Sequence, residues 1–184
     1  PPPKRRGIVK LKKQKENTGK TFEKYRPLFG ELQLYNDQTF AMRAIAIAIA
    51  GKHHMLMIGN PGAGKTMIAR IASDLQSPLT EEEYIEILRI KSNSEPLLTE
   101  HSLQVKRPFR SPHHTASDIS VVGGGRDTRM GEITLAHNGI LFLDELGEFK
   151  PNVIQALREP LEEGKITISR VNYHLTYPAS FLLI

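Results

Sequence analysis

Short apolar runs alternate with helical patterns along the chain, which is typical of an α/β domain. Residues 39–50 are rich in Ala and Ile and predict a buried helix, ended at Gly51 by a residue that tolerates a positive φ. Residues 53–58 form an apolar run between two glycines, which predicts a fully buried parallel strand. A glycine-rich loop follows, and residues 66–75 predict the next helix. A strand, a glycine-rich loop and a helix thus follow one another.

The second half of the chain continues this alternation after an irregular middle. Thr80 and Glu83 match a capping box that would begin a helix over residues 81–89. Residues 92–132 contain Pro, His, Ser and three consecutive glycines, so we expect extended insertions there rather than regular core. The remaining predicted elements are a strand at 139–143, a helix at 151–162 begun by Pro151, and strands at 165–169, 174–177 and 181–184.

The glycine-rich loop reads GNPGAGKT over residues 59–66, which satisfies the phosphate-loop pattern G-x-x-x-x-G-K-[ST]. Glycines let successive backbone N–H groups turn toward phosphate oxygens, and the following helix adds its positive end. Lys65 would bridge the β and γ phosphates of ATP, and Thr66 would bind Mg²⁺. A chance glycine-rich turn is the alternative, but such a turn seldom lies between a buried strand and a helix. The predicted nucleotide-binding residues are Gly59, Asn60, Pro61, Gly62, Ala63, Gly64, Lys65, Thr66 and Met67.

A second motif, ILFLDE at residues 140–145, ends an apolar strand with two acids. Asp144, at the carboxyl end of that strand, would hold Mg²⁺ directly or through water. Glu145 would accept a proton from the attacking water, so Glu145 and Lys65 are the predicted catalytic residues. A solvated acidic turn is the alternative for this pair. Because two motifs of one site support each other, we predict an ATPase.

Longer motifs resemble a known family. RPFRSPHHTAS at 107–117, VVGGG at 121–125, GEITLAHNGILFLDEL at 131–146 and ALREPLEEGKITISR at 156–170 resemble the magnesium-chelatase-like AAA+ proteins of the ComM/YifB type. The likeness runs from about Ala41 to the last residue. It implies a three-layer α/β P-loop NTPase core with a mostly parallel sheet, in a ring-forming, hexameric ATPase that moves on DNA or migrates DNA branches in natural transformation.

Two other functions stay open beside the DNA motor. True chelatase motor subunits share this core and act with a chelatase partner to insert magnesium into a porphyrin. A non-catalytic, truncated remnant is the third possibility, although intact GKT and DE residues argue against long decay. Within the resemblance, residues 164–178 would form a hairpin before the first sensor strand, where Lys165 and Arg170 are candidates for contact with DNA phosphates; solvated basic residues are the alternative.

The resemblance also has departures. Where family members carry a Gly-Gln pair before the first helix, this chain has Asp37 and Gln38, which puts the base pocket in doubt. The sequence ends where the first sensor's polar residue would follow, and it holds no recognisable arginine finger, second sensor or helical lid. We therefore expect residues 22–184 to be a partial AAA+ domain that binds nucleotide weakly and hydrolyses it poorly by itself.

Several polar residues suggest weaker hypotheses. His113 and His114 are adjacent on a segment expected to be extended, where their side chains would point to opposite sides, so we expect packing or hydrogen bonding rather than a shared metal ion. Four arginines could face a neighbouring subunit or DNA, with solvent exposure as the alternative. These are Arg107, Arg110, Arg126 and Arg129.

Charge and composition add the last constraints. The net charge is +5, but residues 1–20 hold eight basic residues and one acid, which leaves −2 for the rest. We interpret residues 1–21 as a disordered basic tail or linker, with nucleic-acid contact as the alternative. The chain has no cysteine, which favours a reducing compartment such as the cytoplasm. No apolar run approaches the roughly 20 residues that a membrane span needs.

Overall fold

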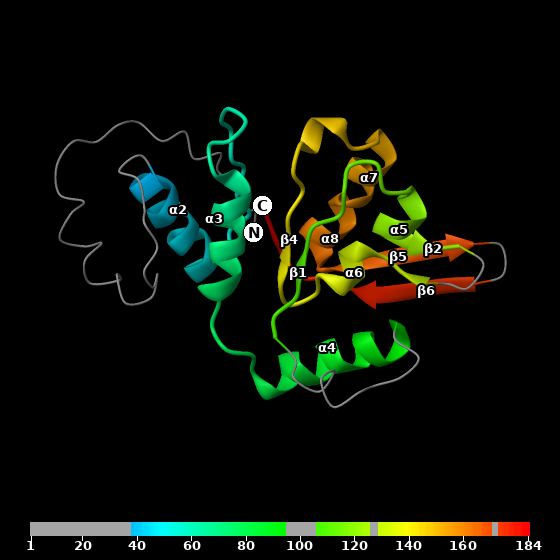
Figure 1. Ribbon diagram of the computed structural model, residues 1–184. Helices are drawn as coiled ribbons and strands as arrows, with labels where there is room; N and C mark the ends of the chain where they lie inside the picture. Colours follow the sequence, from blue (N-terminus) through cyan, green and yellow to red (C-terminus); the bar gives the residue numbers. More distant parts are fainter. Residues whose placement is uncertain (1–37, 95–105, 126–128, 171–172) are drawn as a thin grey trace, which may run out of the picture. The chain divides into compact units, whose positions relative to one another are not determined.

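The computed structural model describes residues 38–94, 106–125, 129–170 and 173–184 (Figure 1). The expected basic tail at 1–21, the domain boundary at 22 and Asp37 lie outside these residues. The described part is an α/β fold whose helices and strands alternate along the chain. The predicted P-loop NTPase class, with a mostly parallel central sheet, is confirmed.

The central sheet consists of three parallel strands in the order β1-β4-β7. These are β1 (Phe109–Arg110), β4 (Ile140–Leu141) and β7 (Leu182–Leu183). Backbone pairing continues beyond these bounds, because Phe142 N donates to Arg110 O at 2.8 Å and Leu143 N to Ile184 O at 3.0 Å. The middle strand is therefore held on both edges as far as the residue before Asp144. The predicted strands at 139–143 and 181–184 are confirmed.

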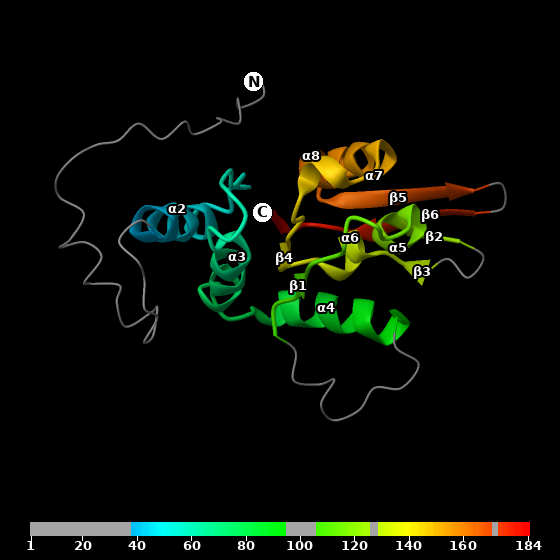
Figure 2. The ribbon, with the colours of Figure 1, turned by 45° about the horizontal axis from the view of Figure 1, so that its top comes forward.

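Helices cover this sheet from more than one side. The first three are α2 (Gln38–Ala50), α3 (Lys65–Asp74) and α4 (Glu81–Ser94). Both ribbon views draw α3 on one side of β4 and α8 (Arg158–Glu163) on the other (Figures 1 and 2). α2 packs against α3, and α4 packs against the short helix α6 (Glu132–Leu135). The arrangement matches the expected layering of helices about a sheet.

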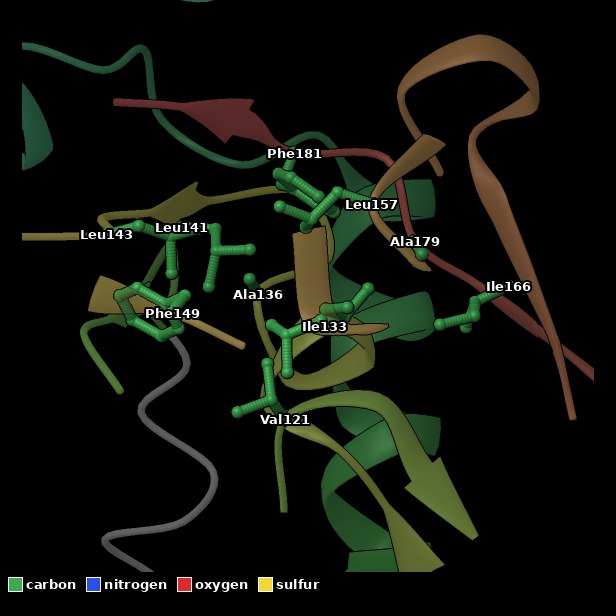
Figure 3. Close-up of a cluster of buried hydrophobic side chains, with 11 residues drawn as sticks. Val121, Ile133, Ala136, Leu141, Leu143, Phe149, Leu157, Ile166, Ala179 and Phe181 are labelled. Atoms are coloured by element: carbon green, nitrogen blue, oxygen red, sulfur yellow. The ribbon is translucent and has the colours of Figure 1, made fainter. Parts of the chain in front are cut away.

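One apolar cluster joins the sheet to the helices that follow it (Figure 3). Leu141 of β4 is fully buried, Leu157 lies between α7 (Pro151–Ala156) and α8, and Phe181 immediately precedes β7. The cluster consists of Val121, Ile133, Ala136, Leu141, Leu143, Phe149, Val153, Leu157, Ile166, Ala179 and Phe181. Because burial of each large side chain contributes about 1.5–3 kcal/mol, this cluster fixes the strand that ends at Asp144.

The expectation of extended insertions over 92–132 is wrong for the residues that the structure describes there. β1 lies in this stretch, and α5 (Asp118–Val122) and α6 bury Val121 and Ile133 completely. Between them, β2 (Gly123–Gly124) pairs antiparallel with β3 (Arg129–Met130). Gly123 has φ +104°, and a Cβ there would lie 2.9 Å from backbone atoms of Arg129 and Gly131. The glycines thus allow two backbone segments to approach closely, in a region where the composition predicted an irregular insertion.

The helix predicted over 151–162 is two helices, α7 (Pro151–Ala156) and α8, separated at Leu157. Pro160 causes the break, because it has no N–H to donate to the carbonyl of Ala156 and its ring clashes with that carbonyl. Leu157 is only 3% exposed and packs in the core at this break. The hairpin that follows, β5 (Lys165–Arg170) with β6 (Tyr173–Pro178), is antiparallel as predicted.

Residues 53–58 do not form the predicted buried strand. Met55 N donates to Leu183 O at 2.9 Å, which places the segment beside β7, but no strand pairing is formed there. Leu56 is 68% and Ile58 91% exposed. The predicted strand and its burial are both wrong for this segment, because an apolar run reveals no packing partner.

The helix boundaries differ by small amounts, for identifiable reasons. α2 ends at Ala50, but the positive φ is at Lys52 (+51°) and not at Gly51. Gly51 has another role, since a Cβ there would lie 2.4 Å from the His53 ring. The capping box of α4 is confirmed: Thr80 N donates to Glu83 Oε2 at 3.0 Å, and Glu83 N to Thr80 Oγ1 at 3.3 Å. α4 continues past Arg89 because Ile90 is buried.

Candidate functional site

The glycine-rich loop before α3 has the backbone that its sequence predicts. Gly62 has φ +79° and Gly64 has φ +81°, which residues other than glycine rarely adopt. A Cβ at Gly62 would meet nothing within 4 Å, so the space over this turn is open. α3 begins at Lys65, and Gly64 supplies no side-chain cap, so no side chain at that position competes for the amides of the first turn. These features leave backbone N–H groups for an anionic ligand.

Lys65 lies over this loop. Its Nζ donates to Gly59 O at 3.0 Å and to Asn60 O at 3.1 Å, so the ammonium group is held at the loop rather than extended into solvent. Met67, in the first turn of α3, is 38% exposed. The opposite face of the helix buries Ile68, Ala69, Ile71 and Ala72, which anchors the loop to the fold.

The two motifs meet in space, although 78 residues separate them. Thr66 Oγ1 donates to Asp144 Oδ2 at 3.1 Å, joining the first turn of α3 to the end of the segment that begins with β4. β4 delivers Asp144 to this point because its strand is buried up to Leu143. A hydroxyl and a carboxylate oxygen are both hard oxygen donors of the kind that Mg²⁺ binds. The residues therefore fit a magnesium ion beside the phosphate loop.

Glu145 lies next to Asp144 in an unusual backbone conformation. Its φ is +55°, its N–H donates to Asp144 Oδ1 at 3.1 Å, and its carbonyl accepts from Glu148 N at 2.8 Å. A non-glycine residue in this region is strained and is retained where neighbouring contacts determine the backbone. The side chain is 64% exposed and points to His114, whose Nδ1 lies 3.3 Å from Glu145 Oε2.

The histidine pair corrects one expectation. The segment is not extended at this point, because Ala116 N donates to His113 O at 2.9 Å and closes a turn. The rings of His113 and His114 consequently lie on one side, with centroids 4.1 Å apart and planes inclined by 35°. In the described part of the chain, no group of three or more His, Asp or Glu side chains could hold a metal ion. The sequence did not indicate the contact between His114 and Glu145, because this contact depends on the turn that the hydrogen bond from Ala116 N to His113 O closes.

Arg107 and Arg110 both form ion pairs with acidic residues of the fold, although Arg110 stays 39% exposed. The side chain of Arg107 is 12% exposed and donates to Glu83 Oε2 at 2.5 Å. This hydrogen bond is the main reason that the pKa of Glu83 lies below its ordinary value. Arg110 pairs with Glu132 at 2.5 Å. Arg126 lies outside the described residues, and Arg129 has partners of its own.

The two predicted DNA-contact residues lie on the hairpin β5–β6. Lys165 begins β5, is 47% exposed and pairs with Glu163 at 2.9 Å. The Glu163 carboxylate raises the pKa of Lys165, so its ammonium is fully charged but already neutralised by a neighbour. Arg170 is the last residue of the same strand. The two residues are five positions apart, at opposite ends of β5, and the fold does not bring them together.

The sequence matches a known family and several curated relatives. Residues 31–184 match a family described as magnesium chelatase, subunit ChlI. The chain is 48% identical over 147 residues to competence protein ComM of Haemophilus influenzae, covering 80% of this chain and 29% of that protein. It is 50% identical over 145 residues to YifB of Salmonella typhimurium, covering 77% of this chain and 28% of that protein. The chain therefore spans less than a third of the curated relatives it matches.

Solved structures show the same fold at lower identity. NtrX from Brucella abortus in complex with ADP has a TM-score of 0.56 and 18% identity, covering 89% of this chain and 32% of that chain. The same protein in complex with ATP has a TM-score of 0.54 and 20% identity, covering 90% of this chain and 32% of that chain. At this identity the likeness concerns the fold alone.

None of the helices in the described part has the length and apolar character needed to cross a membrane.

Proposed function

The chain belongs to the magnesium chelatase subunit ChlI family of AAA+ ATPase modules, and we propose from this premise that it binds ATP together with Mg²⁺ and hydrolyses it. The observation that carries the proposal is the 3.1 Å contact between Thr66 and Asp144, which unites the phosphate-loop and acidic motifs at the end of a buried strand. A chance match of either motif alone would not predict this meeting.

The binding roles follow from the residues at hand. Backbone N–H groups between Gly59 and Met67, except at Pro61, which has none, would surround the phosphates, and Gly62 and Gly64 supply the positive-φ turns of this loop. Lys65 releases its two loop carbonyls and donates to the β and γ phosphates, which is a stronger, charge-assisted interaction. Thr66 and Asp144 would hold the magnesium ion, which would neutralise developing negative charge.

Glu145 acts on water. Its carboxylate accepts a proton as the water oxygen forms a bond to the γ phosphorus, and the bond from that phosphorus to the bridging oxygen breaks, so ADP leaves with the electron pair. The strained backbone at φ +55° is consistent with a residue whose position matters to the reaction. The products are ADP and inorganic phosphate, and the proton on Glu145 returns to solvent.

Phosphate release by the full-length protein tests this assignment. Glu145→Gln keeps the size of the side chain and removes the base, so turnover should fall by about 100-fold or more while ATP still binds. Glu148→Gln is the matched control, because Glu148 is exposed in the same loop, within the 3-10 helix Leu146–Glu148. Equal turnover in the two variants would reject Glu145 as the base. An inactive parent would reject the ATPase proposal itself.

For the whole protein we propose a hexameric, ATP-driven motor that moves on DNA in the cytoplasm. Its support is the 48% identity to a protein named for competence, together with the basic ends of β5. Lys165 and Arg170 would contact backbone phosphates without reading the sequence. Alanine at both positions should weaken DNA binding and flatten its dependence on salt, because each phosphate contact releases a counterion. An unchanged salt slope would remove these two residues from the interface.

The family description favours one second candidate, a chelatase-type motor that drives insertion of magnesium into a porphyrin with a partner protein. The two candidates differ in what stimulates ATP hydrolysis. The DNA motor predicts faster phosphate release with DNA and no effect of a chelatase partner with porphyrin. The reverse result would replace the DNA motor by the chelatase motor. A ring should appear as a six-fold mass in both cases, so assembly does not separate them.

A further inference from the structure

The hairpin β5–β6 is joined to the helix before it by a side chain that the proposed function leaves unused. Glu159 lies in α8, and its carboxylate reaches Thr167 in β5. Its Oε2 accepts from Thr167 N at 3.0 Å, and its Oε1 accepts from Thr167 Oγ1 at 2.6 Å. Both hydrogen bonds are partly buried. These two bonds, the Glu159 clamp, hold both the backbone and the side chain of one strand residue.

The Glu159 clamp acts on the edge of β5 that faces away from β6, because the Thr167 N–H points to α8. β5 and β6 form a two-stranded sheet. A two-stranded hairpin is marginally stable by itself, and its outer edges leave backbone N–H groups without a strand partner. Ile166 and Ile168 hold one face of β5, since they are 2% and 7% exposed. The clamp adds a second, directional restraint at the edge of the strand.

Packed residues connect α8 to the strand that ends at Asp144. Val153 of α7 and Leu157, between the two helices, are buried in the same cluster as Leu143, the residue before Asp144. Close-packed interiors transmit small displacements, so a shift at the nucleotide site would reach α8 and, through Glu159, the hairpin. Both ribbon views draw α8 beside β5, and β5 and β6 reaching away from the parallel sheet (Figures 1 and 2).

We propose that Glu159 is a positioning residue that couples the hairpin to the ATPase site: its two hydrogen bonds to Thr167 hold β5 against α8, so that DNA bound on the hairpin changes the rate of ATP hydrolysis. This inference rests on the proposed DNA motor and deepens it. Glu159 itself binds neither nucleotide nor DNA. Its role depends on hydrogen-bond geometry and not on its charge.

The charge of Glu159 by itself would have a different effect. The pKa of Lys165 is raised chiefly by its hydrogen bond with Glu163, and the charge of Glu159 contributes as well. A carboxylate near Lys165 repels the DNA phosphates that this lysine is proposed to contact. A purely electrostatic role therefore predicts that loss of the charge strengthens DNA binding and leaves the stimulation of hydrolysis intact. The Glu159 clamp predicts that loss of the hydrogen bonds reduces the stimulation.

The test compares ATP hydrolysis by the full-length protein and its variants, each with and without duplex DNA. Glu159→Ala removes both hydrogen bonds and should reduce the stimulation by DNA about fivefold or more, while the rate without DNA stays close to that of the parent. Glu159→Gln should keep most of the stimulation, because its amide oxygen can accept from Thr167 N and its NH₂ group can donate to Thr167 Oγ1. Glu162→Ala is the matched control, since Glu162 is a 60% exposed glutamate of the same helix that pairs with Arg158.

Two variants test the clamp from the side of the strand. Thr167→Val removes the hydroxyl and keeps the backbone N–H, so it should lose part of the stimulation. Thr176→Val is its control, because Thr176 pairs with Thr167 across the hairpin, with the two hydroxyl oxygens 3.5 Å apart. In a Glu159→Ala background, adding Thr167→Val should cost little further, because the two residues act as one unit. If Glu159→Ala fails to fold, the comparison of Thr167→Val with Thr176→Val carries the test.

Hydrogen exchange gives a readout that does not depend on DNA. The Thr167 N–H is bonded to Glu159, so the peptide that contains residues 165–170 should exchange faster in Glu159→Ala than in the parent and in Glu162→Ala. An unchanged exchange rate in Glu159→Ala would reject the inference, because the clamp would then not restrain β5 in solution.

The remaining outcomes separate this inference from the proposed function. A parent protein whose ATP hydrolysis does not respond to DNA rejects the DNA motor and this inference with it. A parent that responds, with Glu159→Ala responding equally, rejects the inference alone. So does a loss of stimulation in Glu159→Gln or in Glu162→Ala as large as that in Glu159→Ala, because negative charge on α8 would then be the cause.

Discussion

Replacement of Arg107 by alanine removes a side chain that joins three separate segments of the fold. Arg107 Nε donates to Ser77 O at 2.6 Å, Nη1 to Asn138 O at 2.8 Å and Nη2 to Pro78 O at 3.2 Å. Nη2 also donates to Glu83, the residue that closes the capping box of α4. The guanidinium group therefore ties the α3–α4 connection to the turn before β4.

The loss of unfolding free energy expected for Arg107→Ala can be worked out from these contacts. Three carbonyl oxygens lose a donor at about 1 kcal/mol each. Glu83 is left without its cation, and breaking a well-buried pair costs about 3–5 kcal/mol when no solvent reaches it. The side chains of Arg107 and Glu83 are 12% and 17% exposed, so part of this penalty is relieved by water. Water also replaces the donor at Ser77 O and Pro78 O, whose hydrogen bonds are exposed. We therefore expect a net loss of about 3 kcal/mol, which corresponds to a fall in Tm of about 6–12 °C for a domain of this size.

Thermal and urea denaturation of parent and variant measure this loss. Arg158→Ala is the control, because Arg158 is 80% exposed and its contact with Glu162 at 3.6 Å is worth less than about 0.5 kcal/mol. Arg107→Lys keeps the charge but loses the planar fork, so it should recover less than half of the stability. The reasoning fails if Arg107→Ala is destabilised no more than Arg158→Ala.

Two further predictions concern stability. The pKa of Glu83 is lowered chiefly by its hydrogen bond from Arg107, so the stability that this pair contributes is present above pH 4.5 and is lost as the pH falls through the lower folded-state pKa. The difference in unfolding free energy between parent and Arg107→Ala should therefore shrink below pH 4.5. A difference that does not change with pH would contradict the assignment. Gly139→Ala places a Cβ 2.0 Å from Pro108 O and should lower the free energy of unfolding by about 3 kcal/mol or more. A Cβ at Gly147 meets nothing within 4 Å, so Gly147→Ala should change this free energy by no more than about 0.5 kcal/mol. Equal melting temperatures of the two variants would refute the close approach of β1 and β4.

The sequence predicted the parts of the fold that depend on local rules. The capping box of Thr80 and Glu83 and the hairpin of β5 and β6 follow from side-chain chemistry and alternation, and both are present. The phosphate loop and the acidic motif were recognisable because each has fixed residue types at fixed spacing. Their meeting at Thr66 and Asp144 was expected from the order of strands in such sheets, and the contact is there.

The features that the sequence did not predict depend on contacts between distant residues. β1 has two residues in a region full of polar residues and glycines, and its pairing with β4 is what makes it a strand. Arg107 resembled a surface residue because its partners, among them Ser77 and Asn138, are at least 24 residues away. His114 gave no sign of approaching Glu145, since the turn at His113 is visible only in three dimensions. The exposure of residues 53–58 likewise depends on neighbours that a local pattern does not contain.

Nucleotide affinity tests the central claim most directly. The parent protein and Lys65→Ala should be titrated with a fluorescent ATP analogue, each with and without Mg²⁺, and Lys91→Ala should serve as the control. We predict that the parent binds more tightly with Mg²⁺, that Lys65→Ala weakens binding at least tenfold, and that Lys91→Ala does not. Equal affinity of the parent and Lys65→Ala would contradict the assignment of residues 59–67 as the phosphate-binding loop.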